Sequence, residues 1–327
     1  MAPPCRVRPA LPLGAHDLQA RILRIGTRGS PLALAQAHEV RGRLMKAHRA
    51  PEEAFEIRIY KTTGDMIQDR PLAEVGGKGL FTKEIEEALL SREIDLAVHS
   101  MKDMQTLLPD GLGIGAVLER EDVRDAFISL RHRSLADLPE GAVVGTSSLR
   151  RQAQVKRLRP DLEVVGFRGN VQTRLKKLAD GVADATMLAC AGLKRLGMAD
   201  RITSPIETAD MLPAVAQGAI AIEIRLDDED AARLIAPLNH EPTAFCVTAE
   251  RAFLTRLEGS CRTPIAGLAE LDGDTLAFRG MTFSPDGAEC FEIARSGAAA
   301  DAHRLGLEAA DAILDLGAHA HLERAQS

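Results

Sequence analysis

The sequence predicts an α/β fold with two lobes, a cleft between them, and a small α/β third domain built on a three-stranded antiparallel sheet. Three observations support this prediction. The length of 327 residues exceeds what one hydrophobic core usually organises. Short β-type runs alternate with helical-period segments over residues 21–118 and again over 124–212, which indicates βαβ units and largely parallel sheets. After residue 239 the pattern changes to strands joined by tight turns.

The first lobe is expected to contain residues 21–118 and 219–238. Its predicted strands lie at 22–26, 55–60, 94–98 and 113–118, and its predicted helices lie at 31–48 and 80–91. The apolar run at 219–225 predicts a further strand, which crosses back into this lobe after the second lobe is complete. The first lobe is therefore expected to be discontinuous in sequence.

The second lobe, residues 119–218, repeats the same plan. Its strands are expected near 142–144, 163–167 and 184–188, with helices starting at Ser148, Val171 and Ala191. The segments LRIGTRGSPLALAQA (23–37) and AVVGTSSLRRQAQ (142–154) echo each other, because each gives a strand, Gly-Thr, a polar cap with arginine, and a helix. Both turns are expected at the C-terminal ends of strands, where α/β sheets bind ligands.

The remaining residues, 239–327, predict the third domain. Thr243 is expected to cap a helix that runs to about residue 257, and a second helix is expected at 299–316. Strands are expected at 265–271, 275–281 and 289–294. Asp272-Gly273 separates the first two, and Asp-Gly between alternating runs is a strong hairpin signal. Residues 1–20 contain four prolines and predict a disordered tail.

Composition excludes several classes of partner. The formal net charge is −6, aromatic residues make up 3% and tryptophan is absent, so neither a basic surface nor stacking platforms for nucleic acid are expected. No apolar run is long enough to span a bilayer, and the prolines near the start argue against a secretory signal peptide. Five cysteines at scattered spacings, with no CxxC pair, predict a reducing, cytoplasmic setting and no metal site.

Five arginines occupy positions where a bound anion would be needed. Each lies at or just before a predicted helix N-terminus, beside a capping residue: Arg28, Arg150, Arg151, Arg168 and Arg174. A cation there opposes the helix dipole unless an anion is bound, and free backbone N–H groups attract the same anion. Several such arginines would hold a polycarboxylate through bidentate contacts. The alternative for any single one is a solvated surface arginine.

A second candidate site is the segment His99-Ser100-Met101-Lys102-Asp103, which follows a predicted strand. It gathers a base, a hydroxyl, an ammonium and a carboxylate at the end of that strand. The alternative is a helix cap with solvated charges, and His99 is expected to hydrogen-bond within the fold. The glycine-rich segment VGGKGLFTKE (75–84) departs from the Walker pattern, so a flexible loop before a helix is favoured over a phosphate site.

Cys261 is the candidate nucleophile. It lies in LEGSCRTP (257–264), a predicted loop between a helix and a strand, next to Arg262. Loop placement and a neighbouring positive charge favour the reactive thiolate. The alternative is a small buried hydrophobic residue, which is the interpretation kept for Cys190 and Cys246 in their apolar helical settings.

Taken together, these segments resemble the porphobilinogen deaminase (hydroxymethylbilane synthase) family. The matching motifs, in family order and spacing from about residue 23 to the last helix, are IGTRGSPLALAQA, VGGKGLFTKE, DLAVHSMKD, GTSSLRRQAQ, RGNVQTRL, AGLKRLG, PAVAQGA and LEGSCRTPIAG. The combination is specific, whereas each motif alone is weak. The resemblance implies two lobes similar to periplasmic binding proteins and a third domain that carries a cysteine loop.

The resemblance also implies an activity. Family members join four porphobilinogen molecules head to tail with loss of four ammonia, on a dipyrromethane cofactor held here by a thioether to Cys261. Hydrolysis then releases the product as linear hydroxymethylbilane. Asp103 matches the catalytic carboxylate. Cofactor-binding positions are matched by Ser100, Lys102, Thr146, Ser148, Arg150, Arg151 and Arg174. Substrate-binding positions are matched by Arg28, Ser30, Arg168 and Arg195.

This chemistry agrees with the residue types. Loss of ammonia from porphobilinogen gives an electron-poor azafulvene, which Asp103 would stabilise and which a Cys261 thiolate would attack to form the anchor. The expected protein is a cytoplasmic, monomeric enzyme that needs no metal, nucleic acid or membrane. The alternative is a non-enzymatic two-lobed anion- or solute-binding protein, which predicts an export signal and no use for Cys261.

Overall fold

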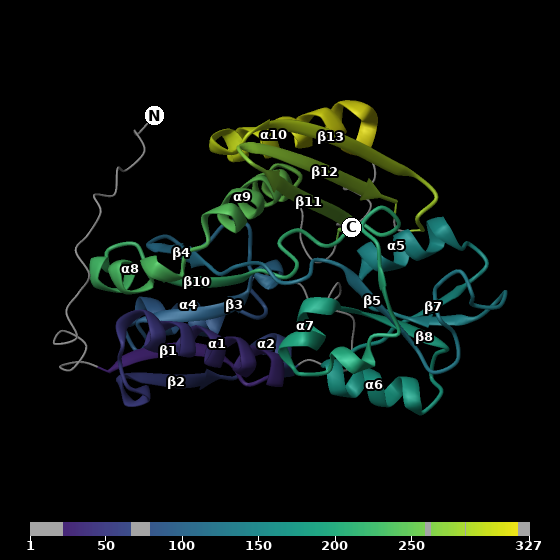
Figure 1. Ribbon diagram of the computed structural model, residues 1–327. Coiled ribbons are helices and arrows are strands. Elements are labelled where there is room, and N and C mark those ends of the chain that lie inside the picture. The colour runs from purple at the N-terminus through teal and green to yellow at the C-terminus, as the bar shows by residue number, and fades with distance from the viewer. Residues whose placement is uncertain (1–21, 67–78, 259–262, 285, 320–327) are drawn as a thin grey trace.

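Three β-sheets organise the protein. The computed structural model describes residues 22–66, 79–258, 263–284 and 286–319. These residues form two five-stranded sheets and one three-stranded sheet. The two larger sheets belong to two neighbouring lobes, and the third sheet lies across both of them (Figure 1). The predicted fold class is therefore confirmed.

The first lobe is a mixed sheet with helices on both faces. Its strands, in spatial order, are β2 (Phe55–Tyr60), β1 (Leu23–Arg28), β3 (Leu96–Ser100), β10 (Ile220–Arg225) and β4 (Leu112–Val117). Strands β1, β2 and β3 are parallel, whereas β10 is antiparallel to both of its neighbours. Successive strand residues alternate between faces, so Val98 packs against α1 (Pro31–His48) and Ala97 against α4 (Lys83–Leu90). Helices α2 (Thr63–Met66) and α8 (Glu229–Ile235) complete the lobe.

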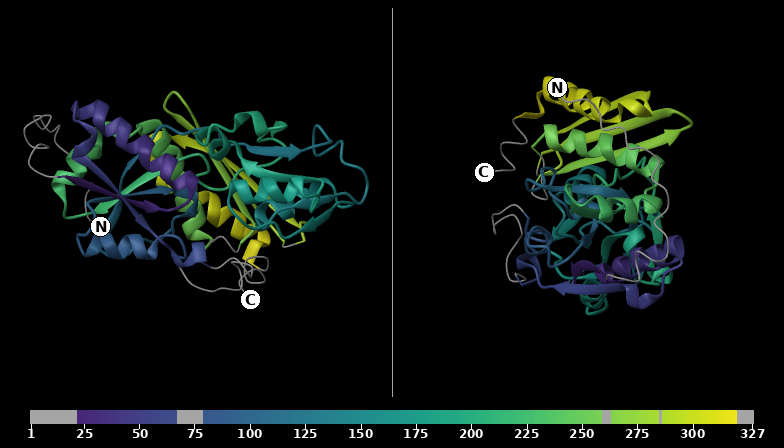
Figure 2. Two further views of the ribbon diagram at one scale, coloured as in Figure 1. Left: turned by 90° about the horizontal axis from the view of Figure 1, so that it is seen from below. Right: turned by 90° about the vertical axis from the view of Figure 1, so that its left-hand side faces the viewer.

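The second lobe has the same architecture. Its strands, in spatial order, are β7 (Glu163–Val165), β6 (Val143–Gly145), β8 (Ala185–Ala189), β5 (Asp125–Ser129) and β9 (Ser204–Ile206). Strands β6, β7 and β8 are parallel, and β5 is antiparallel to β8 and β9. Its helices are α5 (Leu149–Leu158), α6 (Val171–Ala179) and α7 (Cys190–Arg195). The view from below shows the two lobes next to each other, with the first lobe in purple and blue and the second in teal (Figure 2).

The antiparallel strands differ from the prediction of largely parallel sheets. In each lobe, the fourth strand is formed by chain that arrives from the other lobe: β5 follows β4, and β10 follows β9. Because these strands enter without a crossover helix of their own lobe, nothing forces them into the parallel direction. Neither β5 nor β9 was predicted. Strand β9 has only three residues, one of them Pro205, and lies at the sheet edge where proline is tolerated.

The third sheet is antiparallel. Its strands are β11 (Ile265–Asp272), β12 (Thr275–Phe283) and β13 (Cys290–Ala298), and they pack against α9 (Glu241–Arg256) and α10 (Ala302–Ile313). The core joins Phe253 of α9 to Phe278 of β12, whose ring centroids are 5.0 Å apart. The predicted hairpin is present, since Asp272 pairs with Thr275 and Gly273 takes the left-handed conformation.

The cap of α9 differs from the prediction. His240 rather than Thr243 is the N-cap residue, and its side chain accepts a hydrogen bond from Thr243 N. Thr243 lies inside the first turn, where its hydroxyl accepts a 3.1 Å hydrogen bond from Arg120 N. The prediction followed the usual preference for Thr as a cap, and a histidine ring nitrogen gives no comparable signal in the sequence.

Glu250 of α9 ties the third domain to the segments that connect the two lobes. Its side chain is fully buried and accepts hydrogen bonds from Arg120 at 2.6 and 3.0 Å. It also accepts hydrogen bonds from Ala216 N at 2.6 Å and from Ala269 N of β11 at 2.8 Å. Arg120 precedes β5 and Ala216 precedes β10, so one carboxylate contacts both connections and the third sheet. The buried charge is compensated by a counter-ion and by backbone donors.

Replacing Glu250 with Gln is expected to destabilise the protein by about 3–5 kcal/mol, because Arg120 would keep its buried charge without a counter-ion. Guanidinium denaturation followed by far-UV circular dichroism measures the change. The control is Glu308→Gln, which removes a carboxylate that is 49% exposed and pairs with Arg304 on the same helix. We expect the control to leave the midpoint unchanged. Equal midpoints for both variants would contradict the structural role of Glu250.

Candidate active site

Asp103 lies on a short turn that follows β3. The turn is tied to the sheet by a 3.0 Å hydrogen bond from Met101 N to Ala219 O. Ser100, the last residue of β3, accepts a 2.8 Å hydrogen bond from the side-chain amide of Gln36 on α1. The Asp103 side chain keeps 37% of its accessible surface, so its carboxylate is available to a ligand.

Arg28 reaches toward Asp103 from the end of β1. Its Nη1 lies 4.0 Å from Asp103 Oδ2, while Nη2 and Nε donate to Asp65 at 2.5 and 3.2 Å. The guanidinium carbon lies 4.2 Å from the ring centroid of Phe81, which is a cation–π contact. Ser30 begins α1 by accepting a hydrogen bond from the third helical N–H. Asp65, Phe81 and Asp103 thus together define the position of the Arg28 guanidinium.

These residues line one pocket of the first lobe. Its wall includes Arg28, Ser30, Gln36, Phe81, Ser100 and Asp103. A cation, an acid, hydroxyls and an aromatic ring therefore face the same space, which suits a small ring compound that carries carboxylates. His99 also borders the pocket, but its imidazole hydrogen-bonds the buried carboxylate of Glu223 at 3.0 Å. His99 thus hydrogen-bonds within the fold, as predicted.

In the second lobe, Arg150 and Arg151 share one buried carboxylate. Asp125 of β5 has no exposed surface, and its Oδ1 accepts a 2.7 Å hydrogen bond from Arg151 Nη2. Its Oδ2 lies 2.8 Å from Arg150 Nη1. Burial alone would raise the pKa of Asp125, but the two arginines outweigh it and hold that pKa well below its usual range. The carboxylate is therefore charged at neutral pH.

This pairing changes the interpretation of the arginines. We expected Arg150 and Arg151, at the start of α5, to await an anion from outside the protein. Both are only 5% exposed, and Asp125 already supplies the anion. The Arg150 side chain also donates to Leu212 O at 2.8 Å, and Arg151 donates to Met187 O at the same distance. Their first role is therefore structural, although the buried Nε of Arg150 has no hydrogen-bond partner within the described residues.

The hydroxyl groups before α5 shape the turn. Ser148 is the N-cap residue and accepts a hydrogen bond from Arg151 N. Thr146 is buried, and its Oγ1 accepts a 3.2 Å hydrogen bond from Ser148 N. Ser147 accepts a 2.8 Å hydrogen bond from Phe167 N, which joins this turn to the segment after β7. The predicted strand–turn–helix plan is therefore present in detail.

Arg168 and Arg174 follow β7 in the chain. Arg174 is half-buried on α6 and donates to Gly169 O at 2.9 Å. The pKa of Arg174 is lowered to about 10, mainly by burial and also by the positive charges of Arg151 and Arg168, whereas the charge of Asp103 acts in the opposite direction. The charge of Arg174 thus interacts with Asp103 of the first lobe and with Arg151 and Arg168 of the second. Arg151 and Arg168 are near enough to act on Arg174, and such a group of cations favours binding of carboxylates.

Lys102 of the first lobe lies close to these cations. Its Nζ donates to Gln217 Oε1 at 3.2 Å. The pKa of Lys102 is lowered to about 8, mainly by burial and also by the positive charge of Arg151. Because burial disfavours the charged form of Lys102, a bound carboxylate would stabilise that form strongly.

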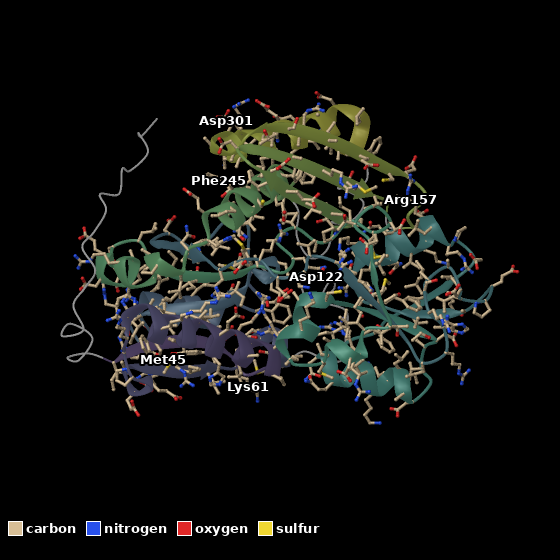
Figure 3. All side chains as sticks on the ribbon, viewed as in Figure 1. Met45, Lys61, Asp122, Arg157, Phe245 and Asp301 are labelled. Carbon is tan, nitrogen blue, oxygen red and sulfur yellow. The ribbon has the colours of Figure 1, made fainter. Side chains whose placement is uncertain are left out.

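Arg195 has a different setting. It ends α7, and its side chain is 9% exposed. Its Nε lies 3.3 Å from Glu39 on α1, and its Nη2 donates to Gly218 O at 3.0 Å. The neighbouring Lys194 pairs at 3.1 Å with Asp122, which lies near the centre of the view in Figure 3. These contacts place Arg195 where α7 of the second lobe meets the first lobe.

Cys261 lies outside the described residues. Of the described cysteines, Cys190 and Cys246 are buried, and burial raises the pKa of each to about 11. Burial also raises the pKa of the half-buried Cys290. These shifts oppose thiolate formation, so all three thiols are poor nucleophiles.

Neither a metal cluster nor a membrane span is found in the described part of the chain. No group of three or more His, Cys, Asp or Glu side chains there is arranged to hold a metal ion. No helix there is both long and apolar enough to cross a bilayer.

Two family models account for most of the chain. Residues 23–233 match the model described as "Porphobilinogen deaminase, dipyromethane cofactor binding domain". Residues 244–315 match "Porphobilinogen deaminase, C-terminal domain". The chain belongs to the porphobilinogen deaminase family. The resemblance inferred from the sequence motifs is therefore confirmed, and a non-enzymatic solute-binding protein is not favoured.

Named relatives agree with this membership. The porphobilinogen deaminase of Paracoccus denitrificans is 61% identical over 289 residues, which cover 88% of this chain and 92% of the relative. The porphobilinogen deaminase of Nitrobacter hamburgensis is 59% identical over 297 residues, covering 91% of this chain and 93% of the relative. A solved putative methionine-binding lipoprotein of Bacillus subtilis aligns with 67% of this chain and 89% of its own, at 15% identity and a TM-score of 0.40.

Four residues of the site were missed in the sequence. Asp65 pairs with Arg28, Phe81 lies against the same guanidinium, Asp125 pairs with two arginines, and Gln217 contacts Lys102. Phe81 and Gln217 lie inside quoted family motifs, so the motifs contained a signal that was not used. Asp125 gave no signal because its strand was not predicted.

Lys102 is expected to titrate near pH 8 in the protein freed of bound carboxylates. Between pH 8 and the ordinary lysine value of 10.5, the native state then holds fewer protons than the unfolded state. The titration of Lys102 alone should therefore increase the free energy of unfolding as the pH rises from 8 to 10.5. Acetic anhydride labelling of Lys102 across pH, quantified by peptide mass spectrometry, measures its titration. A midpoint near 10.5 would show that the ammonium is not desolvated.

Proposed function

We propose that this chain joins four porphobilinogen molecules into hydroxymethylbilane, with Asp103 as the catalytic carboxylate. The observation that carries this proposal is the partly exposed Asp103 side chain, 4.0 Å from Arg28 in a polar pocket, in a chain of this family. Substrate carboxylates are proposed to contact Arg28, Ser30, Arg168 and Arg195.

Each condensation exchanges one bond for another. The C–N bond of the aminomethyl group breaks, and a C–C bond forms between that methylene and the free α-carbon of a pyrrole. The amine leaves as ammonia and carries away the proton that the α-carbon releases, so atoms and charge balance. The azafulvenium formed from the substrate is cationic, and Asp103 is a fixed anion that stabilises it without solvent reorganisation. Asp103 also accepts pyrrole N–H bonds, which orients the ring.

The described residues fit the dipyrromethane cofactor. When bound, this group supplies the free pyrrole α-carbon on which the chain grows. Its acid side chains need cations, and Arg174 and Lys102 are half-buried cations whose pKa values are lowered by burial. The buried Nε of Arg150, without a hydrogen-bond partner in the described part of the chain, is a donor for such an acid. The proposed cofactor contacts are Ser100, Lys102, Thr146, Ser148, Arg150, Arg151 and Arg174.

Cys261 is the proposed attachment point, and the chain before it supports this assignment. Helix α9 ends five residues earlier, at Arg256. Leu254 in its last turn packs with the cluster that contains Met101 and Met104. Met101 begins the turn that carries Asp103, and Met104 follows it.

The chain after Cys261 approaches the opposite wall of the site. Gly267 N of β11 donates to Pro213 O at 3.1 Å. The adjacent Leu212 O accepts the hydrogen bond from Arg150. A thioether between these two approaches would hold the growing chain between Asp103 and the arginines of the second lobe.

We also propose how the chain is organised and where it works. Residues 21–118 with 219–238, residues 119–218, and residues 239–327 are the proposed structural units. The protein is proposed to act as a cytoplasmic monomer on porphobilinogen, without nucleic acid or membrane.

The anchor has a direct test. Protein purified after expression with porphobilinogen available should exceed its sequence mass by one dipyrromethane, and peptide mapping should locate the added mass on Cys261. The control is Cys261→Ser, which should carry no adduct because a hydroxyl is a far weaker nucleophile than a thiolate. An unmodified mass for the unaltered protein would refute the anchor.

The catalytic acid has a second test. Asp103→Asn keeps the shape of the side chain but removes its charge, so turnover of porphobilinogen should fall on the order of 10²-fold or more while the fold is retained. The matched control is Asp110→Asn, an exposed carboxylate that precedes β4 and lies outside the pocket. The control should keep normal turnover. An active Asp103→Asn protein would remove Asp103 from the mechanism.

A further inference from the structure

Gln217 connects the acid-bearing turn of the first lobe to the buried acid of the second. It lies in the segment through which the chain returns to the first lobe, just before β10, and its side chain has no exposed surface. Its Oε1 lies 3.2 Å from Lys102 Nζ, and its Nε2 lies 3.0 Å from Asp125 Oδ1. One amide thus spans the distance between two charged groups that belong to different lobes.

The direction of this amide is set by its partners. Nε2 donates to Asp125 Oδ1 and also to Val123 O at 2.8 Å, so both of its N–H bonds are used. The carbonyl oxygen then faces Lys102. A flipped amide would direct oxygen at two oxygens and N–H at an ammonium, which would leave every contact repulsive. Gln217 therefore presents an acceptor to Lys102 for as long as Asp125 and Val123 stay in place.

The charged groups around Lys102 explain why the Gln217 carbonyl oxygen stabilises its ammonium. Arg150 and Arg151 on α5 oppose its positive charge, whereas Asp103 on its own turn and Asp125 on β5 favour it. Asp125 is already shared by the two arginines. Gln217 is the group that contacts both Asp125 and Lys102, and its dipole is oriented to stabilise the ammonium.

We propose that Gln217 is a positioning residue that keeps the Lys102 ammonium charged and directed at ligand carboxylates when the two lobes are correctly apposed. The proposal rests on the proposed role of Lys102 in binding carboxylates. The two contacts of Gln217 lie on different lobes, so a change in the relative position of the lobes would break one of them. Gln217 thereby makes carboxylate binding in the first lobe depend on the second.

Gln217→Met tests this role, because methionine is similarly long and unbranched but has no strong acceptor. Gln154→Met is the matched control. Gln154 is 3% exposed and hydrogen-bonds Leu212 N at 2.8 Å and Leu212 O at 3.0 Å, so its loss disturbs the same lobe without touching Lys102. In the holoenzyme, we expect the midpoint of Lys102 acetylation to move down by about one pH unit in Gln217→Met and to stay unchanged in Gln154→Met.

Activity gives an independent readout. The alkaline limb of kcat/KM for porphobilinogen should move down by the same amount in Gln217→Met, with KM rising more than kcat falls above pH 7. A third variant, Gln217→Glu, places a carboxylate oxygen beside the ammonium and should move the Lys102 midpoint upward. Opposite shifts for Met and Glu are not expected from a merely structural residue.

Each outcome has one meaning. An unaltered protein that neither carries the cofactor nor consumes porphobilinogen would refute the proposed function, whatever Gln217 does. An active protein in which Gln217→Met leaves the Lys102 midpoint where it was would refute the positioning role alone. An equal shift in Gln154→Met would refute it too, because the effect would then come from general loosening of the second lobe.

Discussion

The sharing of Asp125 by Arg150 and Arg151 is the interaction on which the site depends. An unpaired carboxylate at this depth would cost several kcal/mol, and unpaired arginines would cost as much. The three charges together leave a net positive charge at the start of α5. Burial lowers the pKa of Lys102 and of Arg174, and the positive charge of Arg151 also lowers both, so both cations gain from a bound carboxylate. A structural ion pair thereby prepares the neighbouring cations for an anionic ligand.

Helix α9 of the third domain packs beside the same site and supports it. Glu250 contacts both connections between the lobes, and Leu254 of the same helix packs beside the turn of Asp103. Arg251 on the intervening turn donates to Gln105 O at 2.6 Å. Because these contacts lie along one helix, the segment that leads to Cys261 begins from a rigid support. The acid and its neighbours are thus positioned by packing rather than by the ligand alone.

Much of the fold was predictable, because alternating strand and helix signals are local in sequence. Helix α1 and the Asp272-Gly273 hairpin were found by their proline, capping and turn residues. Strand β10 was predicted from its apolar run, but its antiparallel direction depends on how the chain passes between the lobes, which no local pattern encodes. Strand β5 was not predicted at all. The same limit applies to the arginines: their helix termini were identified, but pairing with Asp125 depends on a strand some 25 residues earlier. Local signals located the candidate residues, whereas only the tertiary structure shows which are neutralised.

The double passage of the chain between the lobes limits how they can move. One connection runs from β4 to β5 and the other from β9 to β10, and each leads into the fourth strand of the sheet that it enters. A single linker would allow one lobe to swivel against the other. Two linkers define an axis, so the easy motion is a door-like opening about the line that joins them, and torsion about the long axis of the molecule is suppressed.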